Sequence, residues 1–280
     1  MPIVNALQVV LRGLAQIFLL RTSTAGALVL CGLLQASATL AAAAVLGSAL
    51  GSGLALLLGQ AQEDVHQGLH GYNAALAAMA ASVFFQPSVL VLSLVFGAVV
   101  AIGLALQALR RWSLPVYTAP FVLALWCAWA VLAPMKLQAG AGPAPGPGEL
   151  VVIDGLLHAL AQVVFLQSVP AAMCVLCAIA LESPRLALQA LAASGLALLI
   201  GLLMEMPDAA LAAGLAGFNA VLCVLALGRH ATLMQTAVAA SGATLLSLAA
   251  QRAGIPALTA PFMLCTWAVL WHRALARSHA

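Results

Sequence analysis

The chain has 280 residues, of which 10 are Lys or Arg and 7 are Asp or Glu, and 65% are hydrophobic. A soluble domain carries about 25% charged residues, whereas this chain carries 6%. So few polar side chains cannot cover a water-exposed surface, and such high hydrophobicity also excludes a disordered chain. The net charge of +3 is small and spread along the chain, so the sequence offers no basic patch for nucleic acid.

Long apolar runs at 88–108, 186–204 and 233–250 predict helices that cross a lipid bilayer. Membrane-spanning strands would instead alternate polar and apolar residues over about ten residues. We therefore predict an all-α polytopic membrane protein. The first apolar segment continues without a small-residue cleavage site, so we expect no cleavable signal peptide. Arg273 and Arg277 follow the last apolar run and favour a cytoplasmic C-terminus.

Each half of the chain opens with an interrupted apolar segment. In the first half, residues 5–20 and 25–34 are separated by Arg-Thr-Ser-Thr. In the second half, residues 151–166 and 171–181 are separated by Gln-Ser-Val-Pro. Each arm is too short to span the bilayer alone. Paired, broken segments at corresponding positions predict re-entrant or half-membrane helices that line a central substrate path.

The two halves also repeat each other in sequence. Three pairs of segments align: LRGLAQ at 11–16 with LHALAQ at 157–162, GLHGYNAAL at 68–76 with GLAGFNAVL at 214–222, and LPVYTAPF at 114–121 with IPALTAPF at 255–262. Leu and Ala recur in any membrane segment, so the matched Gln, Asn, Thr and Pro residues are the informative ones. Such internal repeats are typical of transporter folds.

The Gly- and Pro-rich stretch at 140–149 separates the halves and reads as a loop. We therefore predict a first repeat over 1–139, a linker over 140–149 and a second repeat over 150–280. We count about five transmembrane segments in each repeat by length. An odd number inserts the second repeat upside down, so a pseudo-two-fold axis in the membrane plane would relate the two.

Uncharged polar residues recur at matched positions. Gln16 and Gln162 lie just before the two breaks, and Thr118 and Thr259 each lie three residues after a proline. Because proline leaves a helical carbonyl without its donor, these segments offer carbonyl and hydroxyl oxygens together. Oxygen acceptors on a path suit a solute rich in N–H donors. The alternative is that each Thr hydroxyl bonds back to its own helix.

Aromatic and apolar residues recur near these polar positions: Tyr72, Leu76, Phe165, Phe218 and Leu222. The first two match the last two and are spaced i, i+4 on one helix face. Flat side chains that face one another would form a slot for a planar molecule. The alternative is ordinary helix packing.

The sequence contains no candidate for catalysis, a cofactor or a metal site. The acidic residues fall at expected loops or segment ends, Glu63 and Asp64 among them, and the histidines form no cluster. We interpret Cys174 and Cys177, in an apolar run, as packing residues. The lack of mid-span acids favours a passive path for a neutral solute. An ion- or proton-coupled carrier with Glu205 as the coupling group is the alternative, and a non-transporting scaffold is a third possibility.

These motifs resemble the urea transporters, in their bacterial branch, over nearly the whole chain. The most specific feature is L-P-x-x-T-x-P-F, which occurs twice. The resemblance implies ten spanning segments in two inverted repeats, with half-membrane helices. It further implies passive conduction of urea or a related small amide, without a coupling ion or cofactor. The implied setting is a lipid bilayer, the bacterial inner membrane, with one pore per protomer of a homotrimer.

The resemblance also implies residue roles. Thr118 and Thr259 would line the narrow middle of the pore, with Gln16 and Gln162 at its two mouths. The apolar slots that flank the urea plane would be formed by Tyr72, Leu76, Phe165, Phe218 and Leu222. One departure from the family pattern is Leu19, which stands where the first half usually has a slot Phe.

Overall fold

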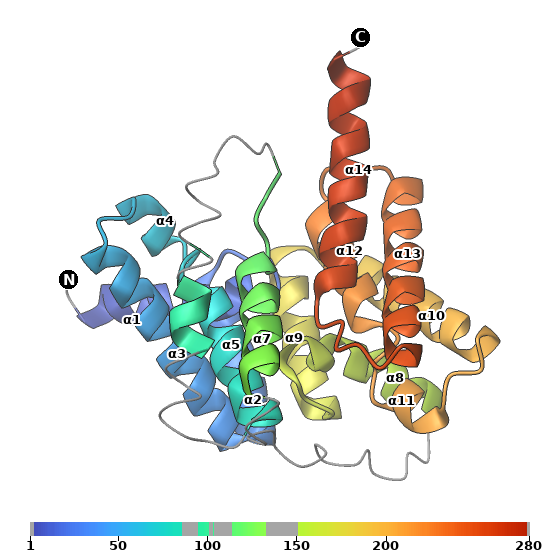
Figure 1. The fold of residues 1–280 in the computed structure, drawn as a ribbon, viewed down its shortest axis with the longest axis horizontal. Coiled ribbons are helices and arrows are strands. Elements are labelled where there is room, and N and C mark those ends of the chain that lie inside the picture. Colours follow the sequence, from blue (N-terminus) through green and yellow to red (C-terminus); the bar gives the residue numbers. More distant parts are fainter. Residues whose placement is uncertain (1–2, 86–94, 101–102, 104–113, 133–150, 279–280) are drawn as a thin grey trace.

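The structure is a computed structural model, and it describes residues 3–85, 95–100, 103, 114–132 and 151–278. The first half contains α1 (Ile3–Gln16), α2 (Ser23–Ala36), α3 (Ala38–Leu57), α4 (Gln62–His66), α5 (Gly71–Phe84) and α7 (Ala119–Leu132). The second half contains α8 (Val151–Ala161), η2 (Gln162–Val164), α9 (Val169–Glu182), α10 (Pro184–Leu203), α11 (Asp208–Ala212), α12 (Phe218–Leu227), α13 (Leu233–Arg252) and α14 (Ala260–Ser278). The two halves lie side by side, blue to green and yellow to red (Figure 1).

The sequence repeat is also a structural repeat. Helices α2, α3 and α4 have 14, 20 and 5 residues, and the matched helices α9, α10 and α11 have the same lengths. The left-handed backbone positions match as well. Their φ angles are 57° at Leu19 and 61° at Phe165, 79° at Gly68 and 75° at Gly214, and 46° at Tyr117 and 50° at Leu258. The duplication therefore extends to the turns that separate the helices.

Matched hydroxyl side chains begin the helices after each break. Thr22 Oγ1 accepts a hydrogen bond from Ala25 N at 3.2 Å, and Ser168 Oγ accepts one from Ala171 N at 3.4 Å. The following helices are capped by Ser37 in the first half and by the matched Ser183 in the second. Such caps satisfy backbone N–H groups that have no partner inside the helix.

The equivalent helices α2 and α9 pack antiparallel. A side chain at Gly32 in α2 would come within 3.1 Å of Cys174 Cβ in α9, so the two helices are in close contact. At their ends, Thr22 N at the start of α2 donates to Glu182 Oε1 at the end of α9 at 2.9 Å. The start of one helix thus lies beside the end of its equivalent. The two equivalent helices therefore run in opposite directions at this contact.

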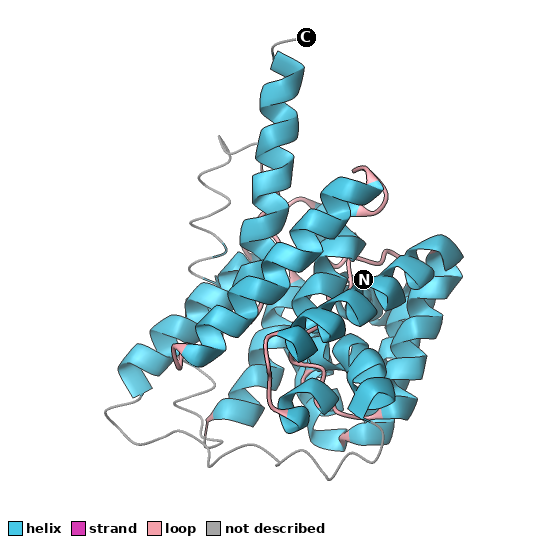
Figure 2. Cartoon of the chain, turned by 90° about the vertical axis from the view of Figure 1, so that its right-hand side faces the viewer, coloured by secondary structure: helices cyan, strands magenta, loops and turns pink. Residues whose placement is uncertain are grey.

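Three described helices are long and apolar enough to cross a membrane, namely α3, α10 and α13. A fourth candidate is the pair Val152–Val164 and Val169–Glu182, which is bent by 74° at its break. This bent pair confirms the predicted broken or re-entrant segment of the second half. Figure 2 shows the helices turned by 90° from the first view, with the last helix extending beyond the others toward the C-terminus. Most of the predicted apolar run at 88–108 and the linker at 140–149 lie outside the described residues.

Two predicted boundaries were wrong. The first-half break lies at residues 17–22 rather than at the polar run 21–24, because Leu19 adopts a left-handed conformation that ends α1 early. The four apolar residues of this break, 17–20, are buried or half-buried. Hydrophobicity alone therefore could not separate them from a helix. In addition, Glu63 and Asp64 lie in the short helix α4 instead of a loop.

Gly68 brings the turn before α5 against α1. Its φ is +79°, and a Cβ added there would lie 2.4 Å from Gly13 N and 2.5 Å from the Arg12 carbonyl carbon. Gly59 also has a positive φ, +69°, but a Cβ there would meet nothing within 4 Å. The two glycines therefore separate the cost of backbone conformation from the cost of a steric clash.

We expect Gly68→Ala to lower the free energy of unfolding by about 3 kcal/mol, because backbone atoms of α1 cannot move aside. Gly59→Ala should cost only about 1 kcal/mol, the conformational penalty of a left-handed residue. Thermal unfolding of both variants in the same detergent measures the difference. Equal shifts in Tm would contradict the close approach at Gly68.

Candidate functional site

Two equivalent threonines meet at the contact between the halves. Thr118 Oγ1 and Thr259 Oγ1 are 2.7 Å apart, and each residue is 4% exposed. Each hydroxyl therefore has a partner in the other half, one as the donor and the other as the acceptor of this bond. Because equivalent residues touch each other, the pseudo-two-fold axis of the repeat passes between them.

Two tryptophans make this contact reciprocal. Trp126 Nε1 donates to Pro256 O at 2.8 Å, and Trp267 Nε1 donates to Pro115 O at 2.8 Å. In each case the tryptophan of one half holds the proline that opens the threonine segment of the other half. The two segments are thus fixed to one another on both sides of the threonine pair.

A buried asparagine holds the first threonine segment in place. Asn73 Nδ2 donates to Tyr117 O at 3.1 Å, and Asn73 Oδ1 accepts from Phe121 N at 3.3 Å. These two backbone groups flank Thr118, and one belongs to a left-handed residue that cannot continue a helical bonding pattern. A single side chain therefore fixes both ends of the turn that presents the threonine.

The second half repeats this arrangement. Asn219 is fully buried, and its Nδ2 donates to Leu258 O at 3.0 Å while its Oδ1 accepts from Phe262 N at 3.3 Å. It also donates to Ser247 Oγ at 2.9 Å. We did not predict either asparagine as a site residue. Their signal was the matched Asn in the GYNAAL and GFNAVL segments.

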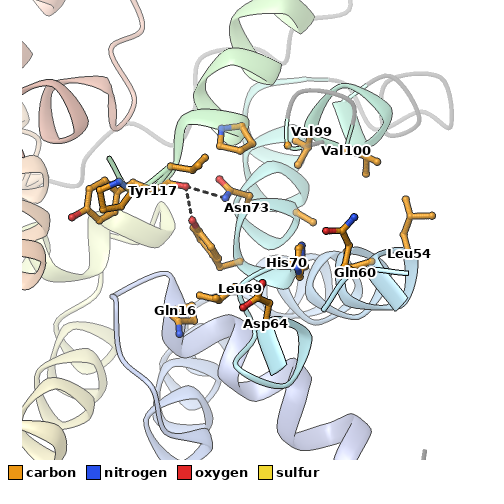
Figure 3. Close-up of a pocket in the computed structure, with 18 of the residues that line it drawn as sticks. Gln16, Leu54, Gln60, Asp64, Leu69, His70, Asn73, Val99, Val100 and Tyr117 are labelled. Carbon is orange, nitrogen blue, oxygen red and sulfur yellow. Dashed lines mark hydrogen bonds between the residues drawn. The ribbon is translucent and has the colours of Figure 1, made fainter. Parts of the chain in front are cut away.

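Tyr72 breaks the symmetry of the two clamps. Its hydroxyl donates to Tyr117 O, the same carbonyl that Asn73 binds (Figure 3). The matched residue is Phe218, which has no hydroxyl. Among the described residues, the carbonyl of Tyr117 thus receives two donors, whereas Leu258 O receives one. A carbonyl accepts two hydrogen bonds, so the Leu258 carbonyl retains accepting capacity.

The two predicted mouth glutamines differ in their partners. Gln16 is 9% exposed, and its Nε2 donates to Gln67 O at 3.1 Å. Gln162 lies in η2 at the bend of the second half, and its Oε1 is buried with no hydrogen-bond partner among the described residues. A buried acceptor without a donor is costly. Such an oxygen is suited to a ligand that brings its own N–H group.

The remaining predicted residues take different positions. Phe165 is half-buried and packs its ring against Phe84 and Phe121 at centroid distances of 5.7 and 6.4 Å. Leu76 and Leu222 are each 1% exposed and belong to the main hydrophobic core, and Phe218 packs against it. None of these four residues lines either cavity described below, so their place in a slot stays a prediction.

Two cavities open at the Gln16 end of the threonine pair. The first has a volume of about 510 Å³, and its lining includes Tyr72 and Asn73 (Figure 3). The second has a volume of about 670 Å³, and we call it the vestibule. Both cavities are lined by Gln16, Leu19, Leu69, Pro115 and Tyr117. The first-half mouth is therefore hollow from the surface down to the clamped segment.

Acidic and metal-binding groups do not converge on the path. Within the described ranges, no three His, Cys, Asp or Glu residues group as metal ligands would. Glu205, the coupling group of the alternative hypothesis, is exposed at the turn after α10 and lines neither cavity. Asp64 is the acid that lines the first cavity, and it lies on the outer helix α4.

A duplicated, multi-pass helical membrane protein whose halves meet at buried hydroxyls beside a cavity belongs to the class of transport proteins. More specifically, the model of the urea transporter family matches residues 7–274, and the chain belongs to this family. It is 30% identical over 238 residues to urea transporter 1 of Rattus norvegicus and 29% identical to that of Mus musculus. Each alignment covers 78% of this chain and 62% of the relative. Urea transporter 1 of Ovis aries is 29% identical over 286 residues, which cover 92% of this chain and 74% of the relative.

We expect Asn219→Ala to lower the free energy of unfolding by about 3 kcal/mol, because it leaves Leu258 O and Phe262 N without their buried partner. Ser247→Ala is the matched control, since it removes only one of the bonds of Asn219 and should cost about 1 kcal/mol. Thermal unfolding in detergent compares the two variants. A loss in Asn219→Ala no greater than in Ser247→Ala would mean that the clamp does not hold the segment.

Proposed function

We propose that this protein conducts urea, or a closely related small amide, passively down its gradient across the membrane. The observation that carries the proposal is the buried Thr118–Thr259 pair, 2.7 Å apart at the meeting point of the two halves, in a chain of the urea transporter family. Urea is neutral and planar, with four N–H donors and one acceptor. It therefore needs acceptor oxygens along its path and no compensating charge.

The predicted residues supply acceptors in sequence. Gln16 stands at the first-half mouth and the threonine pair at the centre. Gln162 stands at the second break, and its buried oxygen has no hydrogen-bond partner in the part of the chain that the structure describes. Around them we assign the apolar flanks of the urea plane to Tyr72, Leu76, Phe165, Phe218 and Leu222. An ion entering such a path would lose its hydration with no opposite charge to replace it.

The threonine contact also suggests how a solute passes. In the absence of solute, one of the two hydroxyls, of Thr118 or Thr259, donates a hydrogen bond to the other. A urea molecule that arrives between them exchanges this one bond for bonds from its own N–H groups to the two oxygens. Because bonds are exchanged rather than lost, the central position binds only moderately. Moderate binding at successive positions is what allows a solute both to enter and to leave.

The membrane arrangement completes the proposal. We assign residues 1–139 and 150–280 to two inverted repeats joined by the linker 140–149. Support comes from the antiparallel packing of α2 and α9, in which Thr22 N meets Glu182 Oε1 at 2.9 Å. We further place the protein in a bacterial inner membrane as a homotrimer with one pore per protomer.

Purified protein in liposomes should accelerate urea equilibration in stopped-flow light scattering, and a proton uncoupler should leave that rate unchanged. Uptake against a urea gradient that collapses with the uncoupler would instead support the coupled carrier. Liposomes with inserted protein that match empty liposomes would refute both forms of transport. Parallel runs with acetamide and with water alone measure selectivity.

We expect Thr118→Val and Thr259→Val each to slow urea flux about fivefold, because each removes one central acceptor oxygen worth about 1 kcal/mol. Thr244→Val is the matched control, since Thr244 is fully buried but donates to Ala240 O of its own helix at 3.1 Å. Its flux should equal that of the unaltered protein. Unchanged flux in both pore variants would remove the threonines from the path.

A further inference from the structure

The two mouths of the duplicated path differ in charge. The vestibule at the first-half mouth is lined by Arg12, Arg21, Arg229 and His230, together with Gln67 and Leu270. The repeat places His158, Gln167, Val83, Phe84, Ala213 and Trp129 at the matched positions of the other half. Three arginines thus line this mouth, and none occupies the matched positions of the opposite mouth. The basic mouth is a feature of one side and does not follow from the repeat.

The same differences between matched residues of the two mouths explain why the vestibule is open. At the opposite mouth Phe84 packs against Trp129 and Phe165, with ring centroids 5.2 and 5.7 Å apart. At the vestibule the matched residues are His230, Leu270 and Leu19, which line the cavity of about 670 Å³. Smaller or polar side chains replace three packed rings. Space and positive charge therefore occur together at this mouth.

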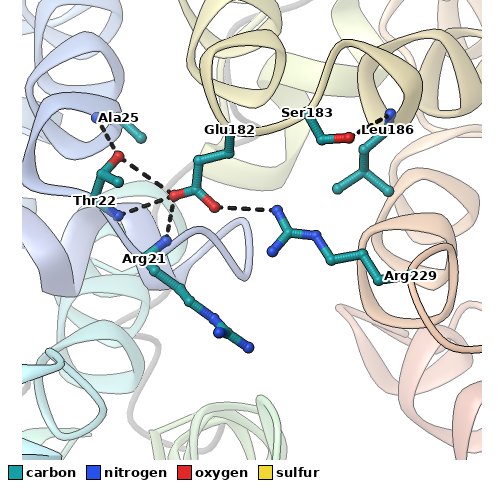
Figure 4. A network of polar contacts seen from close by, with 7 residues as sticks. All are labelled: Arg21, Thr22, Ala25, Glu182, Ser183, Leu186 and Arg229. Carbon is teal, nitrogen blue, oxygen red and sulfur yellow. Dashed lines mark hydrogen bonds and ion pairs between the residues drawn. The ribbon is translucent and has the colours of Figure 1, made fainter.

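The acid that pairs with a vestibule arginine is engaged at both of its carboxylate oxygens. Glu182 accepts hydrogen bonds at Oε1 from the backbone N–H groups of Arg21 and Thr22, and its Oε2 pairs with Arg229 at 3.1 Å (Figure 4). Its side chain is only 8% exposed. One carboxylate thus offsets one guanidinium while it joins the two halves.

Two arginines remain without an acidic partner among the described residues. Arg12 donates to His66 O at 3.0 Å, and a carbonyl does not cancel its charge. Arg21 is exposed and binds Glu182 through its backbone N–H. No Asp or Glu is among the residues that line the vestibule in the described part of the chain. The cavity therefore keeps an excess of about two positive charges from these guanidinium groups, since arginine is always protonated.

We propose that the vestibule binds a small oxyanion of the phosphate or carboxylate class, either free in solution or as the headgroup of an anionic lipid. Guanidinium groups bind such oxyanions through two parallel N–H bonds, and the imidazole of His230 adds an N–H donor in every protonation state. A volume of about 670 Å³ is within the usual range for small-molecule sites.

An anion bound in the vestibule affects solute access to the path. Gln16 lines both the vestibule and the inner cavity, so a bound anion occupies the approach to the path and slows solute access from that side. Leu270 of the vestibule lies three residues before Arg273 on α14. Basic residues are in excess at this end, which is typical of the cytoplasmic side of a membrane protein. The anion therefore reaches the site from the cytoplasm.

Inorganic phosphate is the first probe, used with the full chain in detergent or in phosphatidylcholine nanodiscs at constant ionic strength. Isothermal titration should detect its binding. The test variant is the double substitution Arg12→His and Arg21→Gln, which installs the residues that the second half carries at the matched positions. His158 shows that histidine can keep the bond of Arg12, since its Nδ1 lies 2.7 Å from Ala212 O. Phosphate affinity should fall at least tenfold, as for the loss of a charge-assisted hydrogen bond.

The matched control is Arg252→Gln. Arg252 is also exposed, donates to a backbone carbonyl (Met204 O, 2.6 Å) and lines neither cavity. This variant should bind phosphate as tightly as the unaltered protein. An equal loss of affinity in the control and in the double variant would overturn the proposal, because the anion would then respond to net charge alone.

A second arm separates the two sources of the oxyanion. If phosphate does not bind but the protein retains phosphatidylglycerol over phosphatidylcholine, and the double variant loses this preference, the ligand is the lipid headgroup and the proposal stands. If neither phosphate nor phosphatidylglycerol binds, the proposal is overturned. Binding is measured without urea, so a failure to conduct urea would count against the proposed function and leave this result intact.

Discussion

The fold depends on how it satisfies backbone groups where its helices break inside the bilayer. Lipid offers no water to a free carbonyl or N–H group, so every break needs a protein partner. Around Thr118 that partner is Asn73, which takes both the carbonyl of Tyr117 and the N–H of Phe121. Because the asparagine meets these needs, the threonine hydroxyl does not have to bond back to its own helix. The clamp thus leaves the threonine hydroxyl available for the contact between the two halves.

The second half satisfies its backbone groups in the same way and with the same geometry. Asn219 repeats the bonds of Asn73, and the reciprocal bonds of Trp126 and Trp267 have equal lengths of 2.8 Å. A path built twice in opposite directions presents the same chemistry to a solute from either side. Such a path has no built-in direction at its centre, which is consistent with downhill transport. The halves differ at the clamp, where Phe218 stands for Tyr72, and at the mouths, where Phe165 stands for Leu19.

The sequence predicted the features that repeat or that depend on composition. These are the helical membrane fold, the duplication and the bent segment before α9. The sequence also marked Thr118 and Thr259 as equivalent positions of the repeat, and their direct contact is a finding of the structure. It did not predict the roles of Asn73 and Glu182, whose partners lie far away in the chain and are brought close only by the fold. The early end of α1 was also missed, because buried apolar residues such as Leu19 fit a helix and a left-handed turn equally well by hydrophobicity.

The few charged residues of this chain act at the vestibule, whereas the centre of the molecule is uncharged. Under the proposed function, the centre excludes ions of either sign, because its oxygens and apolar walls cannot replace the energy of hydration around a full charge. The arginines of the vestibule add a field that lowers the local concentration of cations and raises that of anions. A neutral solute does not respond to net charge, so the basic mouth leaves its approach unhindered when no anion is bound. Charge at one mouth and neutrality at the centre therefore discriminate between solutes in sequence. Only the second of these filters is a property of both halves.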